Sequence, residues 1–294
     1  MEFGKIANVD HVNWEIPNED PLTRPFLNQF ATKKTKFYIG APAWGHKEWI
    51  GRLYPPKTPA TDFLFHYSRN FNTIELNTTH YRIPTADVVK NWVNKVPGDF
   101  LFCPKIPQLI SHAVNGLVDS SNVSEWIKAI DRFGSNLGPC FLQLPPTFSY
   151  TFKAELFQFL KLWPAGYKLA IEFRHPSWFG EGRVLAALVE YLQKRDIGLV
   201  ITDVAGRRDV VHTSISASFS FLRFIGNDLH DSDFSRVRLW AQRLEGWQQQ
   251  GLQNLFFIVH QPDDLKTPEM SDFVIDELNV ICRAGLAPLA KPLL

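Results

Sequence analysis

Eight short apolar runs, rich in β-branched and aromatic residues, recur along the chain from Phe37 onward. They are "FYIGAPAW", "NTIELNTT", "DFLFCPKIP", "GPCFLQLPP", "YKLAIEFRH", "IGLVITDV", "SFSFLRFIG" and "NLFFIVH". The periodicity of the apolar residues predicts helices between or after them, in 62–70, 85–95, 122–134, 152–162, 181–195, 233–248 and 268–283. Residues 205–217 read as a loop where a further helix would be expected. Strands that alternate with helices in this way predict a parallel sheet.

The number of runs predicts the fold class. Eight strands alternating with helices are typical of an α/β protein with a single (β/α)8 TIM-type barrel, which we expect over residues 37–294. The polar, proline-containing stretch 1–36 is predicted to be an irregular N-terminal arm. A doubly wound open sheet is the alternative. No glycine-rich dinucleotide or phosphate loop follows any of the runs, which favours the barrel.

The overall charge and the cysteines limit the class of protein. A formal net charge of +1 gives no global attraction for nucleic acid or for an anionic membrane. The three cysteines are widely spaced and contain no CxxC motif, which argues against a disulfide framework or a structural zinc site. The chain shows neither a signal-peptide pattern at its start nor a long apolar stretch. We therefore expect a cytoplasmic protein with no membrane partner.

Two charges interrupt the fifth run. Side chains alternate between the two faces of a strand, so Leu169, Ile171 and Phe173 form one apolar face suited to packing against helices. Glu172 and Arg174 then point to the interior of the barrel, near the carboxyl end of the strand. Active sites of TIM barrels are built at that end. The stretch therefore predicts a functional site instead of a flawed core strand.

The same reasoning places polar residues of several other strands at the same end. The inward set is Glu75, Asn77, Lys105, Gln143, Glu172, Arg174, Asp203 and Arg223. Three acids and three bases in this set predict a self-compensated cluster, and an anion bound to the basic residues would free a carboxylate for proton transfer. The alternative is a set of ion pairs that only fill the end of the barrel.

Aromatic residues are predicted just beyond several strand ends. They are Trp44, Trp49, Tyr54, Tyr81 and Trp178. In this position they would stack on a base or a sugar, or else pin the long loops by packing.

Other chemistries find less support in the sequence. A metal site would combine Glu75, Glu172 and Asp203 with His175 or His260, and such carboxylates suit Mg or Mn. The chain has no HxH or HExxH motif, and we expect no cofactor. Glycoside hydrolysis would use Glu75 and Glu172 as its carboxylate pair. Nucleophilic catalysis has little support, because the chain lacks the GxSxG motif that presents a catalytic serine on a sharp turn. Cys103 is better explained as a packing residue.

Seven of these segments, in this order and with this spacing, resemble the YecE-like family, a family of proteins of unknown function. The likeness covers roughly residues 37–226 and implies a TIM-type barrel without an established reaction. Matching motif positions are Trp44, Trp49, Tyr54, Glu75, Asn77, Tyr81, Lys105, His112, Gln143, Glu172, Arg174, His175, Trp178, Asp203, Arg223 and Gly226. The chain departs from the family pattern at "APAW" and in "HQPDDLKTPEM" after the last strand.

These observations lead to two hypotheses of function. The first is an enzyme, a hydrolase or an isomerase, that acts on a phosphate- or carboxylate-bearing sugar or nucleic acid fragment. Catalysis would then fall to Glu75, Glu172 and Asp203. The substrate would contact Trp44, Asn77, Tyr81, Lys105, Gln143, Arg174, Trp178 and Arg223. The second is a noncatalytic barrel that binds an anion or single-stranded nucleic acid.

Overall fold

The eight expected strands are present, and all their pairings are parallel. The structure is a computed structural model and describes residues 4–30, 34–179 and 183–290. The strands are β1 (Lys36–Gly40), β2 (Thr73–Leu76), β3 (Leu101–Pro104), β4 (Cys140–Gln143), β5 (Leu169–Glu172), β6 (Gly198–Asp203), β7 (Phe219–Ile225) and β8 (Asn254–His260). Six form one sheet in the order β1-β8-β7-β6-β5-β4, and β2 and β3 form a second sheet.

The hydrogen-bond ladder is interrupted at two seams among the described residues, so a closed barrel is not detected. Between β1 and β2, the Glu75 amide donates to the Ala41 carbonyl at 3.3 Å. A Cβ on Gly40 would lie 2.3 Å from the Thr73 carbonyl oxygen, so glycine is needed for this close approach. Between β3 and β4, the Ile106 amide donates to the Phe141 carbonyl at 2.9 Å.

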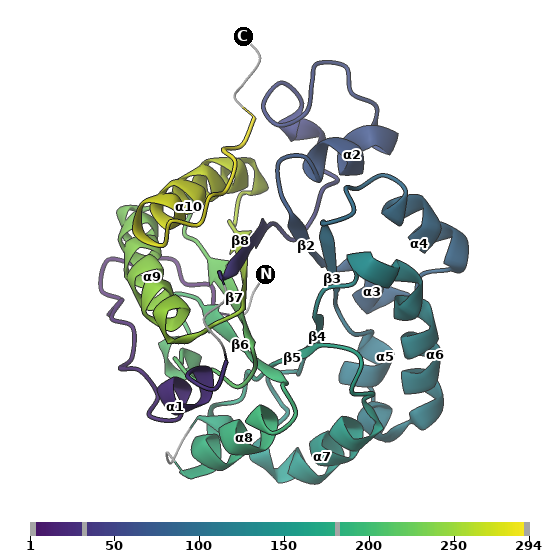
Figure 1. Cartoon of the computed structure of the whole chain (residues 1–294), viewed down its shortest axis with the longest axis vertical. Helices are drawn as coiled ribbons and strands as arrows, with labels where there is room; N and C mark the ends of the chain where they lie inside the picture. The colour runs from purple at the N-terminus through teal and green to yellow at the C-terminus, as the bar shows by residue number, and fades with distance from the viewer. Residues whose placement is uncertain (1–3, 31–33, 180–182, 291–294) are drawn as a thin grey trace.

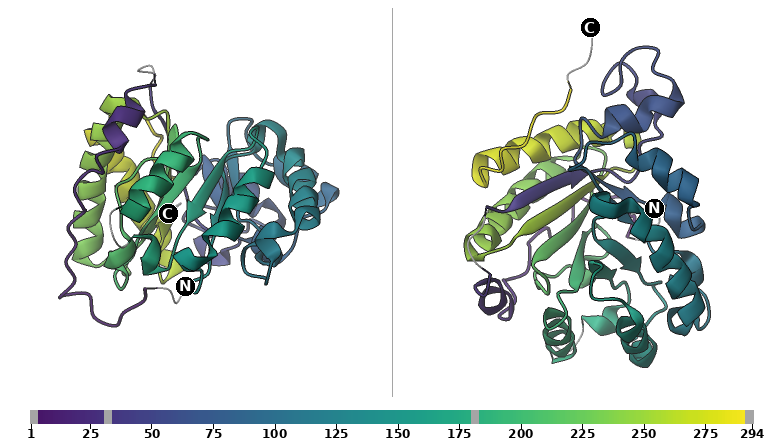
Figure 2. Two further views of the ribbon diagram at one scale, coloured as in Figure 1. Left: turned by 90° about the horizontal axis from the view of Figure 1, so that it is seen from below. Right: turned by 45° about the vertical axis from the view of Figure 1, so that its right-hand side comes forward.

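The helices surround the strands, as Figures 1 and 2 show. They are α1 (Thr23–Leu27), α2 (Phe63–Tyr67), α3 (Thr78–Tyr81), α4 (Ala86–Val93), α5 (Gln108–Ser111), α6 (Ser120–Ile130), α7 (Lys153–Leu162), α8 (Arg183–Gln193), α9 (Asp231–Gln250) and α10 (Thr267–Ile281). The seven expected helices match α2, α4 and α6–α10. Capping fixes several starts; the Asp119 carboxylate, for example, accepts the amides of Ser121 and Asn122 at α6. Residues 205–217 contain only the 3-10 turn Arg208–Val210, as predicted.

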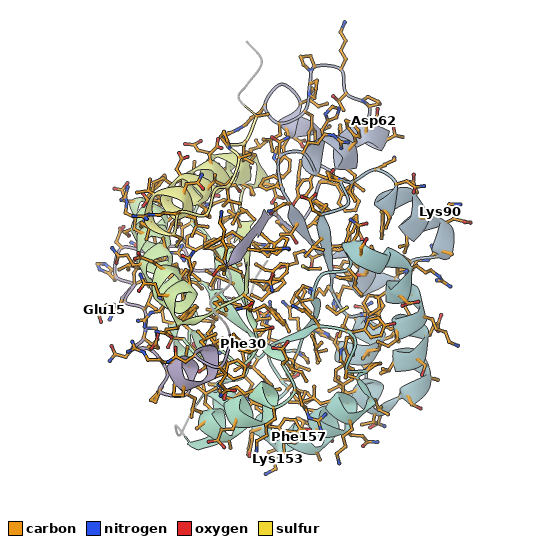
Figure 3. The ribbon with its side chains drawn as sticks, in the orientation of Figure 1. Glu15, Phe30, Asp62, Lys90, Lys153 and Phe157 are labelled. Atoms are coloured by element: carbon orange, nitrogen blue, oxygen red, sulfur yellow. The ribbon has the colours of Figure 1, made fainter. Side chains whose placement is uncertain are left out.

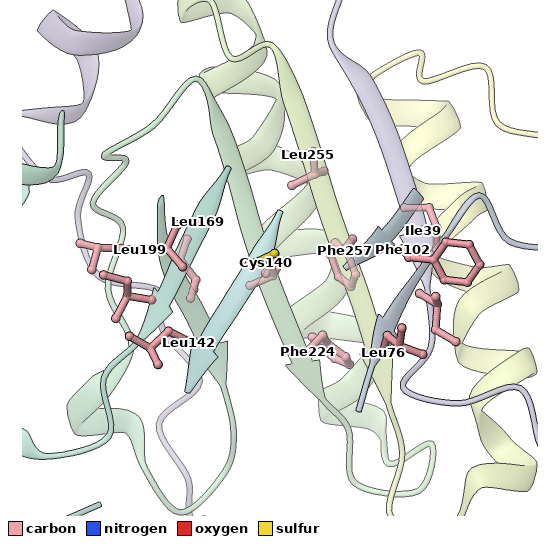
Figure 4. Close-up of a cluster of buried hydrophobic side chains, with 14 of the residues drawn as sticks. Ile39, Leu76, Phe102, Cys140, Leu142, Leu169, Leu199, Phe224, Leu255 and Phe257 are labelled. Carbon is pink, nitrogen blue, oxygen red and sulfur yellow. The ribbon is translucent and has the colours of Figure 1, made fainter. Parts of the chain in front are cut away.

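Alternation along the strands produces two separate cores. The outer core fills the space between strands and helices, and Figure 4 shows its strand residues, such as Leu142, Leu169 and Phe257. The inner core contains Cys103, Phe141, Ala170, Val200, Ala217, Phe219, Phe221, Phe256 and Ile258. Its aromatic rings stack, with Phe141 and Phe221 at 5.7 Å and Phe221 and Phe256 at 6.0 Å between ring centroids. This aromatic layer lies under the carboxyl ends of the strands.

The N-terminal segment packs on the outside of the six-stranded sheet. Its Asp20 amide donates to the Thr213 hydroxyl, and its Thr23 hydroxyl donates to the Thr213 carbonyl, both at 3.1 Å. The Arg243 guanidinium of α9 donates to the Pro17 carbonyl at 3.1 Å. Among the described residues of the N-terminal segment, the five residues of α1 are those with regular secondary structure. In the described part of the chain, every helix is too short or too polar to traverse a bilayer.

Candidate functional site

Glu75 and Arg223 form the centre of a buried polar cluster on the inner face, at the carboxyl ends of the strands. The Nε of Arg223 lies 2.7 Å from Oε2 of Glu75, and its Nη2 lies 3.0 Å from Oε1. Glu75 is fully buried and Arg223 is 1% exposed. Because β2 and β7 belong to different sheets, this bidentate pair joins the two sheets by side chains.

Glu172 on β5 extends the cluster. Its Oε2 accepts from Nη1 of Arg223 at 3.0 Å and from Nε2 of Gln143 at 2.7 Å. Its Oε1 accepts from Nε of Arg174 at 2.8 Å. Gln143 and Glu172 are register partners on β4 and β5, so the strand pairing itself brings them together. Three donors therefore hold one buried carboxylate in a single orientation.

Lys105, the residue after β3, also belongs to the cluster, but its hydrogen-bond partner is an amide and not a carboxylate. Its Nζ donates to Oε1 of Gln143 at 2.8 Å, and this amide oxygen faces Lys105 because the amide nitrogen is committed to Glu172. Among the described residues, no carboxylate oxygen lies within 4 Å of the Lys105 ammonium. Lys105 and Arg174 are each 9% exposed as whole residues, more than Glu75, Glu172 or Arg223, so both lie on the solvent side of the cluster.

The two carboxylates are ionised. Burial opposes ionisation of Glu172, but Arg174 and Arg223 outweigh it and lower the pKa to about 2. Burial opposes ionisation of Glu75 too, and Arg223 and His260 hold its pKa well below the usual range. Burial first and the Arg223 charge second lower the pKa of Lys105 to about 8. Within the described part of the chain, the cluster therefore contains three cations, Lys105, Arg174 and Arg223, and two carboxylates at neutral pH.

Further polar groups line the solvent side. Nδ2 of Asn77 donates to Oε1 of Glu75 at 3.0 Å. Tyr81 is 73% exposed, the most open of the predicted aromatic residues. His80, next to it on α3, hydrogen-bonds through Nδ1 to the Ile106 carbonyl at 3.0 Å, which leaves Nε2 as the acceptor nitrogen of the neutral ring. Trp44 is half-buried and packs edge-on against Trp92 at 5.8 Å between ring centroids.

Asp203 does not join the cluster, contrary to the sequence-based expectation. It points outward to α9, where Oδ1 lies 3.1 Å from Nη1 of Arg236 and Oδ2 accepts from Nε1 of Trp240 at 2.6 Å. Arg208 also donates to Oδ1. The inner position of β6 belongs to Thr202, the register partner of Arg223. Asp203 shares its face with Leu199 and Ile201, and this alternation in "GLVITD" could have revealed the error.

Trp178 is also misplaced by the sequence-based prediction. It is fully buried, its Nε1 donates to the Phe148 carbonyl at 2.8 Å, and its ring packs 4.3 Å from that of Phe173. Since Phe173 faces the helices, Trp178 belongs to the outer core. Trp49 and Tyr54 are likewise buried to 1% exposure, which supports their alternative role of pinning a loop.

Three polar groups near the cluster were not among the predicted catalytic or substrate-binding residues, although His260 was named as a possible metal ligand. Nε2 of His260, at the end of β8, lies 3.3 Å from Oε2 of Glu75; its parity with Phe256 and Ile258 was a usable signal. Thr202 has a buried hydroxyl without a hydrogen-bond partner among the described residues. The third is His80, which follows its strand by four residues and carries no periodic signal.

The predicted metal set is not assembled. Asp203 faces α9, and Nδ1 of His175 accepts the Ser177 amide at 3.2 Å at the start of a 3-10 turn. In residues 4–30, 34–179 and 183–290, no three His, Cys, Asp or Glu side chains are grouped so that they could hold a metal ion. A groove of about 850 Å³ lies elsewhere, between the N-terminal segment and α9, and contains none of the predicted site residues.

Comparison with known proteins identifies the family. The model of a family described as "Protein of unknown function DUF72" matches residues 38–290. The chain belongs to the DUF72 family. The UPF0759 protein YecE of Escherichia coli K12 is 32% identical to this DUF72 protein over 259 residues, which cover 82% of this chain and 92% of YecE. The UPF0759 protein YunF of Bacillus subtilis 168 is 30% identical over 48% of this chain and 52% of YunF.

Solved DUF72 structures share the fold. A DUF72 protein of Enterococcus faecalis V583 (EF0366) aligns with a TM-score of 0.67 at 15% identity, over 86% of this chain and 99% of that one. A DUF72 protein of Thermotoga maritima MSB8 (TM1631) gives a TM-score of 0.64 at 19% identity, over 85% and 100% of the two chains. These likenesses establish a mixed α/β fold with parallel strands. The family description names no reaction, so function must be argued from the cluster itself.

Proposed function

We propose that this protein is an enzyme that acts on a small phosphate- or carboxylate-bearing substrate, a sugar or nucleic acid fragment, bound at the carboxyl ends of the strands. The Lys105 ammonium is the observation that carries the proposal. Its hydrogen-bond partner is a neutral amide, and no carboxylate oxygen of the described residues lies within 4 Å of it. A partly desolvated cation at the edge of a buried network is a natural partner for an anion.

The proposal includes a TIM-type barrel as the scaffold. The backbone hydrogen bonds at the two seams and the Glu75–Arg223 pair between β2 and β7 support closure of the two sheets around one interior. Such a barrel would present its charged end to solvent, where TIM-barrel enzymes bind their substrates.

The residues divide into two roles. Lys105 and Arg174, which reach solvent, would bind the anion, with Asn77 and Tyr81 contacting the rest of the substrate. Glu75, Glu172 and Gln143 would hold the cations in place, and Arg223 would connect the two carboxylates. With a pKa of about 2, Glu172 can serve as a weak base toward the substrate but not as an acid at neutral pH. Asp203 has no part in this scheme.

A noncatalytic anion-binding protein is the second candidate. The ionised state of Glu75 and Glu172, each committed to arginine, favours it, because neither is poised near neutral pH for proton transfer. The single-stranded nucleic acid version of this candidate has less support, since Trp49, Tyr54 and Trp178 are buried and Tyr81 remains for stacking.

Anion binding is tested by titration calorimetry with inorganic phosphate at low ionic strength. We expect Lys105→Met to weaken binding by about tenfold or more. Lys168→Met is the matched control, because Lys168 lies before β5 with its Nζ 5.3 Å from the Phe219 ring, at the opposite end of the inner face. Equal binding by the wild type and Lys105→Met would reject the proposal.

Enzymatic activity is tested separately. Phosphodiesters, sugar phosphates and abasic DNA are offered with and without Mg or Mn, and turnover should disappear in Glu172→Gln. Phosphate binding without turnover of any substrate would favour the noncatalytic candidate.

A further inference from the structure

Lys105 differs from the other cations of the cluster in its surroundings. Arg223 contacts Glu75 and Glu172, and Arg174 contacts Glu172, whereas Nζ of Lys105 has the Gln143 amide oxygen as its hydrogen-bond partner. The Phe141 ring lies below it, with its centroid 5.6 Å from Nζ, and the Arg223 guanidinium is 5.3 Å from the same ring. Burial of the amine and the neighbouring Arg223 cation favour its neutral form, and they outweigh the two carboxylates, which favour the ammonium as the face of the Phe141 ring does.

The backbone around Lys105 is held firmly. Its amide donates to the Leu76 carbonyl at 3.2 Å, and its carbonyl accepts from the Thr79 hydroxyl at 2.8 Å. The side chain therefore extends from a fixed backbone position, and its amine donates to the Gln143 side-chain amide, while 9% of the residue remains exposed. A reactive group is most useful when its base is rigid and its tip can reach the substrate.

We propose that Lys105 is a nucleophile whose amine forms an imine with the carbonyl group of an anionic oxo compound, a 2-oxo acid or a phosphorylated ketone. The inference rests on the proposed function, because the same cluster binds the anionic group of this substrate. Its pKa of about 8 supports the assignment. At pH 7 roughly a tenth of such an amine is neutral, compared with less than about a thousandth of an ordinary lysine.

The reaction balances without a further reagent. The Lys105 ammonium loses one proton to solvent, and the neutral nitrogen attacks the carbonyl carbon, forming the C–N bond. The carbonyl oxygen then leaves as water, and its two hydrogens equal the two protons that the ammonium gives up in all. The product is a protonated imine that keeps the single positive charge of the ammonium. The charge of the cluster is therefore the same before and after the reaction.

Trapping with borohydride tests the inference, because hydride reduces the imine to a stable secondary amine. The full-length protein is incubated with pyruvate in one arm and with dihydroxyacetone phosphate in the other, then reduced, digested and analysed by mass spectrometry. We expect modification of Lys105 in at least one arm, and the arm identifies the anionic group. With the oxo compound at a concentration that saturates the cluster at every pH, labelling should increase as the pH rises through about 8, since more amine is then neutral.

Two variants separate this inference from the proposed function. Lys105→Arg keeps a positive charge but has no amine that can form an imine, so it should lose the adduct. Lys168→Arg, outside the cluster, should keep both phosphate binding and the adduct on Lys105. Phosphate binding by the wild type without an adduct in either arm, or equal labelling of Lys168, would overturn the imine and leave the proposed function standing. Absence of phosphate binding would instead refute the proposed function.

Discussion

Two buried charge networks lie on opposite sides of the layer of strands. The inner network, on the carboxyl ends of the strands, contains Glu75, Glu172, Arg174, Arg223 and Lys105. The outer network, between β6 and α9, contains Asp203, Asp233, Arg208 and Arg236, with Asp233 2.7 Å from Arg236. The outer charges cancel. Among the described residues, the inner network has one cation more than it has carboxylates, and Lys105 is the cation that contacts no carboxylate of this part of the chain.

The difference shows that a charge at the end of a strand does not by itself mark a functional site. Asp203 and Glu172 both end their strands in a buried position, yet Asp203 ties β6 to a helix while Glu172 orients groups that reach solvent. The Trp14 ring covers the outer network, 4.4 Å from the Arg236 guanidinium. Figure 3 shows where exposed charges such as Lys90 and Lys153 lie instead, at the periphery. A balanced, covered network is structural; an unbalanced network that reaches solvent has capacity for a ligand.

Removing Arg223 should have the largest effect. Arg223→Met removes the arginine that contacts Glu75 and leaves Glu172 with Arg174, while both carboxylates stay buried. We expect the free energy of unfolding, measured in urea, to fall by about 3–5 kcal/mol. Glu75→Gln is the milder companion variant, which keeps the shape and removes one charge. A loss below about 1 kcal/mol for Arg223→Met would mean that the Glu75–Arg223 pair does not hold the two sheets together.

Neutralising Asp203 should destabilise the protein without changing ligand binding. Asp203→Asn removes one of the two carboxylates that face Arg236, and we expect a loss of about 2 kcal/mol in the same urea assay. Phosphate affinity, measured by calorimetry, should stay within about twofold of the wild type. A large loss of phosphate affinity would mean that Asp203 contributes to ligand binding, and the two networks would then not differ in function.

The excess charge of the inner network should make anion affinity depend on pH. A bound anion favours the Lys105 ammonium, so affinity is full below the pKa of about 8 and falls as the pH rises through it. Sulfate is the suitable probe because it does not titrate in this range. We expect affinity to fall about fivefold between pH 8 and pH 9. Lys105→Met should abolish this dependence, and a flat profile in the wild type would contradict the assignment.

The smallest effect should come from the cover of the outer network. Trp14→Ala removes a cation–π contact with Arg236, and we expect a loss of about 1 kcal/mol, read from the thermal midpoint. Phosphate affinity should not change. A change in phosphate affinity would mean that the N-terminal segment affects the inner network and that the outer and inner networks are energetically coupled.

The sequence predicted the elements better than the way they join. Long helices and strands carry many periodic residues, so all seven expected helices were found, whereas α3 and α5 have four residues each and leave no such signal. Continuity of the ladder between β1 and β2 or between β3 and β4 depends on backbone geometry, which hydrophobic patterns do not record. The barrel therefore remains a proposal, while the parallel α/β arrangement is established.

The site could be predicted where alternation was applied over a whole strand. For β5 the rule correctly placed Glu172 inward and Leu169 and Ile171 outward. For Asp203 the type of residue was given more weight than its parity, and the prediction of an inner position was wrong. Trp178 lies beyond its strand, where the two-residue alternation no longer applies.

The hydrogen bonds of the inner network cross both seams of the fold. Lys105 and Glu75 come from the two-stranded sheet side, while Gln143, Glu172, Arg223 and His260 come from the six-stranded sheet. A ligand held by Lys105 and Arg174 would therefore clamp one sheet against the other. Amide protons of β2 and β3 should then exchange more slowly with solvent in the complex. The exchange rate of the two-stranded sheet would therefore measure how much of the protein has ligand bound.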